Sequence, residues 1–283
     1  MIIINLKGGL GNQMFQYSFG RAFSIKNDVE VKLDISGYPR QSLRDYKLSA
    51  FNIKENIARD DEVKEYKYPF GIVSKGWRFF NQRILRNFKK DYEPKLLEYR
   101  EHGYIDGFFQ SEKYFLQIRE ILLREFTLLK PLSPEAYKVA EKIREATIPI
   151  SLHVRRGDYA SDPILRLRLG LCPIEYYEKA TEIIANGFPE ATFFIFSDDI
   201  AWVKENLSLP YSVIYVSTPG IEDYEELHLM SLCKHHIIAN SSFSWWGAWL
   251  DPNPNKIVIA PKKWTNAIPD DHPNIIPESW TRI

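Results

Sequence analysis

Residues 148–159 read Ile-Pro-Ile-Ser-Leu-His-Val-Arg-Arg-Gly-Asp-Tyr, an apolar run that stops at two arginines and a glycine. The run from Ile148 to Val154 predicts a buried β-strand. Side chains alternate along a strand, so His153 and Arg155 share one face. The stretch therefore predicts a core strand that presents a basic, polar group at its carboxyl end.

Helix-like and strand-like segments alternate after this strand. The expected helices are residues 173–186, 199–206, 222–233 and 244–250, and the expected strands are 192–197, 212–216, 236–239 and 256–260. Alternation at this spacing predicts a parallel sheet with helices on both faces. Ligands of such sheets bind beyond the carboxyl ends of the strands, which is where the chemistry is to be sought.

The first half of the chain is less regular. We expect strands at residues 2–6 and 29–35 and helices at 12–26, 111–126 and 134–146, whereas 46–115 shows no clear pattern. A chain of 283 residues suggests about two domains. The sequence predicts an α/β protein with an N-terminal domain of residues 1–147 and a C-terminal domain of residues 148–283.

Composition excludes several classes of protein. Lysine and arginine number 37, and so do aspartate and glutamate, so no overall charge favours nucleic acid or an anionic membrane. The two cysteines, Cys172 and Cys233, make neither a disulfide scaffold nor a metal cluster and suggest a reducing compartment. The apolar N-terminal run is too short for a signal peptide, and no run of about 18 apolar residues occurs. We expect a soluble, cytoplasmic protein.

The first candidate site is the group His153, Arg155 and Asp158 at the end of the opening strand. A histidine and a guanidinium directed to one side can clamp a phosphate group. Gly157 allows a tight turn, and we expect Asp158 to pair with Arg156. The alternative is a structural cluster of salt bridges.

A second candidate follows the strand at 192–197, where Ser197 is succeeded by Asp198 and Asp199. A carboxylate there can accept hydrogen bonds from a guanine edge or a ribose. The alternative is that one of the two aspartates caps the helix that follows. Because there are two, one remains for another role.

A third candidate precedes the helix at 244–250 and consists of Asn240, Ser241, Ser242 and Phe243. Free backbone N–H groups and hydroxyls at a helix start can hold an anion. The alternative is ordinary capping by Ser242. We expect the tryptophans at 245, 246 and 249 to lie in the core.

A glycine-rich segment, Lys7 to Gln13, joins the first strand to the first helix. It does not match G-x-G-x-x-G, because residue 14 is Met, and no Walker lysine follows. Its glycines still predict close approach of a ligand to the backbone, with Gly9, Asn12 and Gln13 as candidate contacts. No D-x-D motif occurs in the chain, which favours an arginine clamp over a metal ion for a diphosphate.

Together these segments resemble the bacterial α-1,2-fucosyltransferases of glycosyltransferase family 11. The resemblance rests on residues 8–17 (GGLGNQMFQY), 153–159 (HVRRGDY), 196–199 (FSDD) and 241–250 (SSFSWWGAWL), which span nearly the whole chain. Residues 173–177 (PIEYY) are also similar to a segment of the core α-1,6-fucosyltransferases.

The resemblance implies a GT-B-like architecture of two Rossmann-like domains with a cleft between them. It implies inverting transfer of L-fucose from GDP-β-L-fucose to a galactose hydroxyl, with no metal and no cofactor. By similarity, Arg155 and His153 would contact the β-phosphate, and Asp198 the guanine. Ser241, Ser242 and Phe243 would complete the diphosphate pocket, with Asn12 reaching in from the N-terminal domain.

The acceptor hydroxyl must also lose its proton. Asp158 and Asp162 are the carboxylates nearest in sequence, and the choice between them stays open. The other functions considered are transfer from another GDP-sugar and non-catalytic binding of a glycan or nucleotide.

A last alternative is a peripheral membrane protein acting on lipid-linked glycans. Residues 75–90 carry six basic and no acidic residues, with aromatic and aliphatic side chains on one helical face. This pattern is typical of an interfacial helix. It is also consistent with a helix docked on the N-terminal domain with a solvated basic face.

Overall fold

The structure is a computed structural model that describes residues 1–40, 44–67, 92–98, 103–266 and 274–283. The chain forms two compact units, Met1–Leu129 with Pro273–Pro277, and Lys130–His272 with Glu278–Ile283. The helix α5 (Pro134–Glu145) belongs with the second unit, since it packs against α10 (Asp223–Ser231).

The first unit is built on a three-stranded parallel sheet in the order β2-β1-β3. Its strands are β1 (Ile2–Asn5), β2 (Val31–Asp34) and β3 (Gly103–Ile105), and its α-helices include α1 (Leu10–Asn27), α2 (Asp60–Lys67) and α4 (Arg119–Glu125). Apolar residues Met14, Phe15, Phe19 and Phe23 of α1 are completely buried. This long helix therefore organises the core of the unit.

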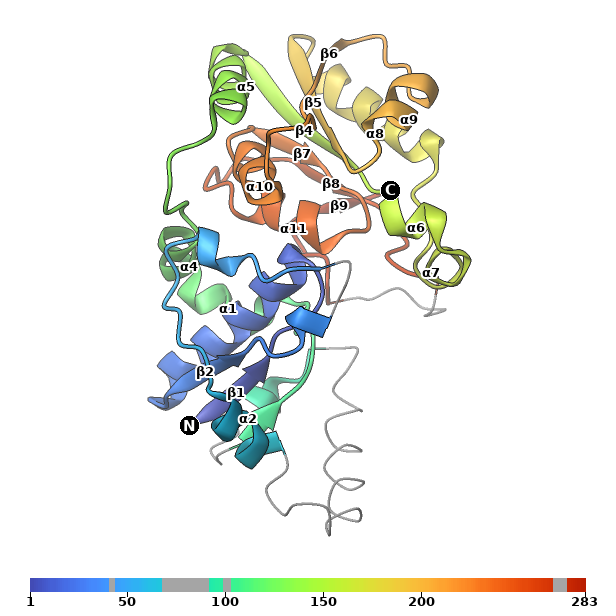
Figure 1. Cartoon of the computed structure of the whole chain (residues 1–283). Coiled ribbons are helices and arrows are strands. Elements are labelled where there is room, and N and C mark those ends of the chain that lie inside the picture. Colours follow the sequence, from blue (N-terminus) through green and yellow to red (C-terminus); the bar gives the residue numbers. More distant parts are fainter. Residues whose placement is uncertain (41–43, 68–91, 99–102, 267–273) are drawn as a thin grey trace. The chain divides into compact units, whose positions relative to one another are not determined.

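The second unit contains a six-stranded sheet in the order β6-β5-β4-β7-β8-β9, with every paired neighbour parallel. The strands are β4 (Ile148–Val154), β5 (Ala191–Ser197), β6 (Ser212–Tyr215), β7 (His235–Ile237), β8 (Val258–Ala260) and β9 (Thr281–Arg282). The α-helices are α5, α6 (Gly157–Ser161), α7 (Pro163–Leu169), α8 (Ile174–Gly187), α9 (Ile200–Asn206), α10 and α11 (Ser242–Trp249). Figure 1 shows the strands as neighbouring arrows between these helices.

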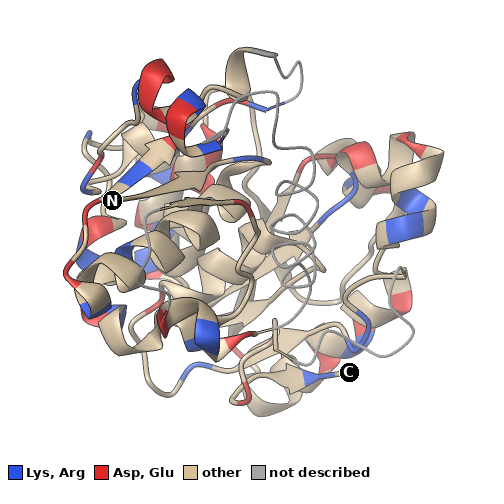
Figure 2. Cartoon of the chain, turned by 90° about the horizontal axis from the view of Figure 1, so that it is seen from below, with Lys and Arg blue, Asp and Glu red and all other residues tan. Residues whose placement is uncertain are grey.

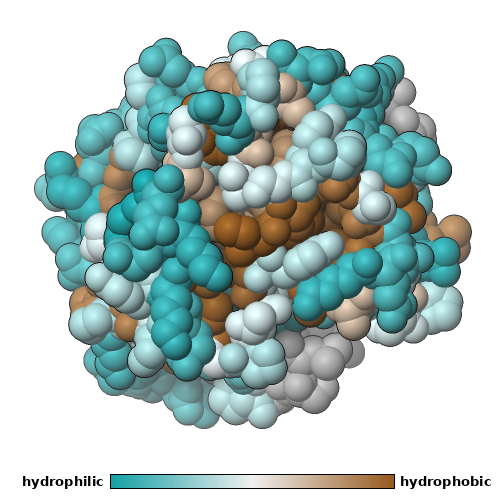
Figure 3. All heavy atoms as spheres, turned by 90° about the horizontal axis from the view of Figure 1, so that it is seen from above, coloured by the Kyte–Doolittle hydropathy of each residue, from teal (hydrophilic) through white to brown (hydrophobic). Residues whose placement is uncertain are grey.

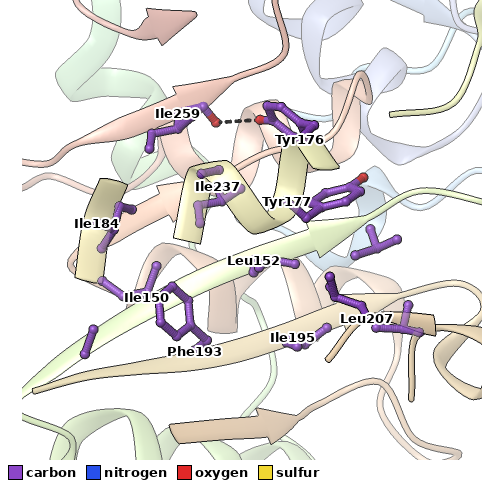
Figure 4. Packing of buried hydrophobic residues seen from close by; sticks show 14 residues of the cluster. Ile150, Leu152, Tyr176, Tyr177, Ile184, Phe193, Ile195, Leu207, Ile237 and Ile259 are labelled. Carbon is purple, nitrogen blue, oxygen red and sulfur yellow. Dashed lines mark hydrogen bonds between the residues drawn. The ribbon is translucent and has the colours of Figure 1, made fainter. Parts of the chain in front are cut away.

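Alternate residues of the central strands bury against different helices. Phe193 and Ile195 of β5 pack in a cluster with side chains of α8 and α9, as Figure 4 shows for the labelled residues. Phe194 and Phe196 pack in a second cluster with α5 and α10. Both faces of the sheet are thus covered, as the continuous apolar strands predict.

Most expected elements of the second half are confirmed within a few residues, and the strand 148–154 is found with its predicted bounds. Trp245, Trp246 and Trp249 are buried, which confirms that they belong to the core. The helix expected at 111–126 is instead two short 3₁₀ turns followed by α4. Helices α2, α6 and α7 and strands β3 and β9 were not predicted. The basic amphipathic stretch at 75–90 lies outside the described residues.

The described surface mixes both signs of charge, and Figure 2 shows acidic and basic residues interspersed. Figure 3 shows apolar residues gathered near the middle of one face within a hydrophilic border. On α7, Ile164 and Leu167 are 75% and 80% exposed. Among the residues described, no helix combines the length and apolar character needed to cross a membrane.

The Tyr176 hydroxyl joins the ends of two strands and provides a test of this packing. It donates to the carbonyls of Ile238 (2.7 Å) and Ile259 (3.1 Å), the second of which is drawn in Figure 4. We expect Tyr176→Phe to lower the free energy of unfolding by about 1–3 kcal/mol, because buried carbonyls lose a donor. Urea denaturation measures this. The control Tyr137→Phe, at an exposed position on α5, should change it by less than about 0.5 kcal/mol. Equal stability of the Tyr176 variant and the wild type would contradict this account.

Candidate functional site

Arg155 lies directly after β4 and is held by two carboxylates. Its guanidinium forms ion pairs with Asp158 and with Asp198, the latter at 2.7 Å between Nη1 and Oδ2. The same group lies 5.0 Å from the centre of the Tyr159 ring. Its Nε is buried and has no hydrogen-bond partner among the described residues. The guanidinium is therefore fixed in place, with one of its N–H groups still unpaired.

Arg156 projects to the opposite side, as the alternation along β4 predicts. Its guanidinium lies 3.5 Å from the centre of the Trp202 ring, and its Nε donates to Asp199 at 3.1 Å. The expected pairing of Arg156 with Asp158 was wrong, because Asp158 pairs with Arg155. Helix α6 begins at Gly157, and this turn brings the carboxylate of Asp158 back to Arg155, three positions earlier in the chain.

Gly157 is required by the close approach of β4 and β5. Its φ is +23°, a value that side-chain-bearing residues rarely adopt. A Cβ at this position would lie 2.3 Å from Oδ2 of Asp198. Because Asp198 also accepts a hydrogen bond from the backbone N–H of Arg156 at 2.8 Å, its carboxylate joins both arginines at this turn.

His153 is 4% exposed, and its Nδ1 has no hydrogen-bond partner in the part of the chain that the structure describes. Its ring lies 5.5 Å from that of Phe243, between centroids. Burial, and secondarily the charge of Arg155, lower the pKa of His153 to about 3. The imidazole is thus neutral near pH 7 and adds hydrogen-bonding atoms to the site, not a second positive charge.

The two aspartates after β5 have different surroundings. Asp199 accepts from the backbone N–H of Trp202 at 3.3 Å and so caps α9. The hydroxyl of Ser197 accepts from the backbone N–H of Asp199 at 3.0 Å and helps to shape this turn. The capping role that was left open between the two therefore falls to Asp199, and Asp198 faces Arg155.

Sequence reasoning missed Glu226, a half-buried residue of α10. Burial, and to a smaller extent the nearby charges of Asp223 and Asp198, raise the pKa of Glu226 to about 7, although a hydrogen bond with Ser217 acts in the opposite direction. Its hydrogen-bond partner is the hydroxyl of Ser217, which also accepts from the backbone N–H of Ser197 at 2.9 Å. Glu226 thus belongs to the cluster around Asp198. The acidic run 222–226 gave no signal as to which carboxylate turns inward.

The segment before α11 is partly structural. Ser241 is the N-cap, with its hydroxyl accepting from the backbone N–H of Phe243 at 3.3 Å, so the cap is not Ser242, the residue named in the alternative interpretation. The buried side-chain amide of Asn240 donates to the carbonyls of Leu169 (3.1 Å) and Trp264 (3.2 Å) and fixes two loops. Ser242 and Phe243 are half-buried at the first turn.

Asp162, the other candidate for the catalytic base, caps α7. Its carboxylate accepts from the backbone N–H groups of Ile164 (2.8 Å) and Leu165 (3.2 Å). Both candidate bases are therefore engaged, Asp158 by Arg155 and Asp162 by α7. Within the described ranges, no group of three or more histidine, cysteine, aspartate or glutamate residues is arranged to hold a metal ion.

In the first unit, the candidate residues lie where β1 leads into α1. Gly9 precedes the helix as its N-cap. Gln13 is completely buried and binds the carbonyls of Gly8 (3.1 Å) and Asp45 (2.8 Å), so it holds a loop in place. Asn12 is half-buried, and its Oδ1 accepts from Nε2 of Gln110 at 2.8 Å.

Comparisons with known proteins place these features in a family. The family model described as "Glycosyl transferase family 11" matches residues 1–283. The chain is 35% identical over 291 residues to the alpha-1,2-colitosyltransferase of Escherichia coli, covering 100% of this chain and 99% of that protein. It is 27% identical to the human galactoside alpha-(1,2)-fucosyltransferase 1 over 154 residues, covering 52% of this chain and 42% of that protein.

A solved structure with a related fold is the NodZ alpha-1,6-fucosyltransferase soaked with GDP-fucose. It aligns with a TM-score of 0.52 over 91% of this chain and 94% of that chain, at 16% sequence identity. The chain therefore has an α/β fold with parallel sheets that is GT-B-like.

Proposed function

Since the chain belongs to glycosyl transferase family 11, we propose that it transfers L-fucose from GDP-β-L-fucose to the 2-hydroxyl of a galactose in a glycan acceptor. The observation that carries the proposal is the constrained Arg155, with a free Nε at the carboxyl end of a parallel strand. Transfer proceeds with inversion, so that a β-linked donor gives an α-1,2 linkage.

The residues of the second unit account for departure of the nucleotide. Glycosyl transfer passes through an oxocarbenium-like state, in which negative charge grows on the leaving diphosphate. Arg155 supplies a fixed positive charge there, and His153 and the first turn of α11 supply hydrogen-bonding groups without charge. Preorganised donors of this kind lower the barrier by about 3–4 kcal/mol each. Neither a metal ion nor a cofactor is needed in this scheme.

The carboxylates of Asp198 and Glu226 are suited to the base of the nucleotide. Guanine presents adjacent N–H donors to a carboxylate, whereas uracil places carbonyl oxygens beside its single N–H. Glu226 is the better placed of the two, because Asp198 is already bound by Arg155 and by the backbone of Arg156. Its raised pKa reflects the burial of the carboxylate, together with the nearby negative charges of Asp223 and Asp198.

A second donor is supported by one finding. The relative that aligns over the whole chain at 35% identity is named a colitosyltransferase, and colitose is fucose without its 3-hydroxyl. The α-1,2 transfer is common to both donors, and they differ in one hydroxyl group.

The test is a panel of GDP-fucose, GDP-colitose, GDP-mannose and UDP-galactose against β-galactosides, with products detected by mass. We expect a fucosylated galactoside, formed equally well in EDTA. Transfer only from GDP-colitose would replace fucose as the donor sugar. Binding of GDP without transfer to any acceptor would favour a non-catalytic binding protein.

We expect Arg155→Lys to lower kcat by about 10²–10³-fold, as the loss of one donor to a developing anion does elsewhere. An ammonium group cannot keep both carboxylates and a phosphate in the planar geometry of a guanidinium. The matched control is Arg156→Lys, whose side chain stacks on Trp202 away from Arg155 and should retain more activity. Steady-state kinetics with a galactoside acceptor measure both. If Arg156→Lys were inactive and Arg155→Lys active, the two roles would be reversed.

We expect GDP to bind most tightly above pH 7 and to lose affinity as the pH falls below 7, approaching tenfold per pH unit. In the protein without GDP, Glu226 becomes protonated in this pH range. Bound guanine favours the carboxylate form of Glu226 and therefore lowers the pKa of Glu226. Calorimetry between pH 5.5 and 8.5 should show this dependence reduced in Glu226→Gln, which also binds GDP more weakly. The titration of the phosphate is common to both proteins. The exposed Glu205→Gln is the control, and an unchanged pH profile in Glu226→Gln would exclude Glu226 from base recognition.

A further inference from the structure

The carboxyl end of the sheet in the first unit presents an exposed aromatic ring. Phe108 follows β3 and is 37% exposed, although the residues on either side of it, Gly107 and Phe109, are buried. Strands β1 and β3 are paired, with Ile4 opposite Ile105. The segments that follow these two strands, residues 6–12 and 106–110, therefore emerge side by side.

The backbone is bent to turn Phe109 inward. Phe109 has φ of +51°, which is uncommon for a bulky residue, and its ring stacks on the buried Phe19 with centroids 3.9 Å apart. A Cβ on Gly107 would lie 2.7 Å from the Phe109 ring, so this turn needs glycine. Because Phe109 fills the core, the neighbouring Phe108 remains at the surface.

The same two segments carry two polar pairs. Lys7 forms an ion pair with Asp106, and its Nζ lies 4.9 Å from the centre of the Phe108 ring. Asn12 and Gln110 form an amide pair through Asn12 Oδ1. Within the part of the chain that the structure describes, Asn12 Nδ2 and Gln110 Oε1 make no hydrogen bond. One donor group and one acceptor group thus remain available on the two segments that also carry Lys7 and Phe108.

We propose that Phe108, Asn12, Gln110 and Asp106 form the subsite for the galactose of the acceptor. Galactose has one ring face formed by C–H groups, since its 4-hydroxyl is axial, and this face suits an exposed aromatic ring. Its hydroxyls both donate and accept, which matches the free atoms of the amide pair. The ion pair between Lys7 and Asp106 is neutral overall, so the surface favours an uncharged polyhydroxyl ligand over an anion. This subsite rests on the proposed function.

The test uses the full chain with Phe108→Ala and Gln110→Ala. For methyl β-galactoside or lactose as acceptor, we expect the KM to rise about tenfold or more in each variant, while the KM for GDP-fucose is unchanged. Phe108→Trp, which keeps an aromatic face, should restore most of the affinity. Leu116→Ala is the control, because Leu116 is an exposed apolar residue of the same unit, 48% exposed. Its acceptor KM should equal that of the wild type.

A direct binding measurement tests the galactose subsite separately from the proposed transfer of fucose. Saturation-transfer NMR with methyl β-galactoside should give a signal with the wild type and with Leu116→Ala, and a reduced signal with Phe108→Ala and Gln110→Ala. Unaltered acceptor KM values in both variants, with transfer intact, would overturn the subsite and leave the proposed function standing. Loss of the NMR signal in these variants without any transfer by the wild type would support the subsite and overturn the function.

Discussion

The ion pairs of Arg155 with Asp158 and Asp198 set the geometry of the candidate site. Asp198 follows β5 and Arg155 follows β4, so their contact joins the ends of two neighbouring strands. The contact requires glycine at position 157, because any side chain there would collide with the Asp198 carboxylate. The turn into α6 and the position of Asp158 both follow from that glycine. One close approach between strands thus determines where the positive charge lies.

The same arrangement limits how strongly the site attracts an anion. Two arginines, Arg155 and Arg156, are surrounded by three aspartates, Asp158, Asp198 and Asp199. A diphosphate must compete with these carboxylates for the guanidinium of Arg155. The carboxylates also hold the planar guanidinium of Arg155 in one orientation before a ligand binds, so binding costs little side-chain entropy. The site therefore holds the arginine side chain in a defined orientation but exerts little long-range electrostatic attraction on an anion.

Much of the second unit was predictable from the sequence, and the failures have specific physical causes. The apolar run 148–154 predicted a covered strand, which the structure has with the same bounds. The two arginines that follow it have different partners, Asp158 and Asp198 for Arg155 and Asp199 for Arg156. The ion-pair partner of Asp158 was predicted wrongly, because it depends on a backbone turn at Gly157 that the hydrophobic periodicity of the sequence does not reveal. Glu226 was not identified because four acidic residues occupy the five positions 222–226 at the start of its helix, and nothing in the sequence distinguishes them. Helix α7 was not predicted from the sequence. Its apolar residues Ile164 and Leu167 are exposed, whereas apolar residues at this spacing ordinarily mark the buried face of a helix.

The atoms left without partners argue most directly that this strand end is a site for a ligand. A buried polar atom without a hydrogen bond costs about 1–3 kcal/mol, and such atoms are uncommon in folded proteins. His153 Nδ1 and Arg155 Nε are both of this kind, and they lie two residues apart on the same side of β4. The buried amide of Asn240, in the same unit, donates to three backbone carbonyls. Among the described residues the hydroxyl of Tyr177 is also buried without a hydrogen-bond partner, so an unpaired atom does not by itself mark a ligand site. What distinguishes His153 and Arg155 is their place at the carboxyl end of β4, where ligands of parallel sheets bind.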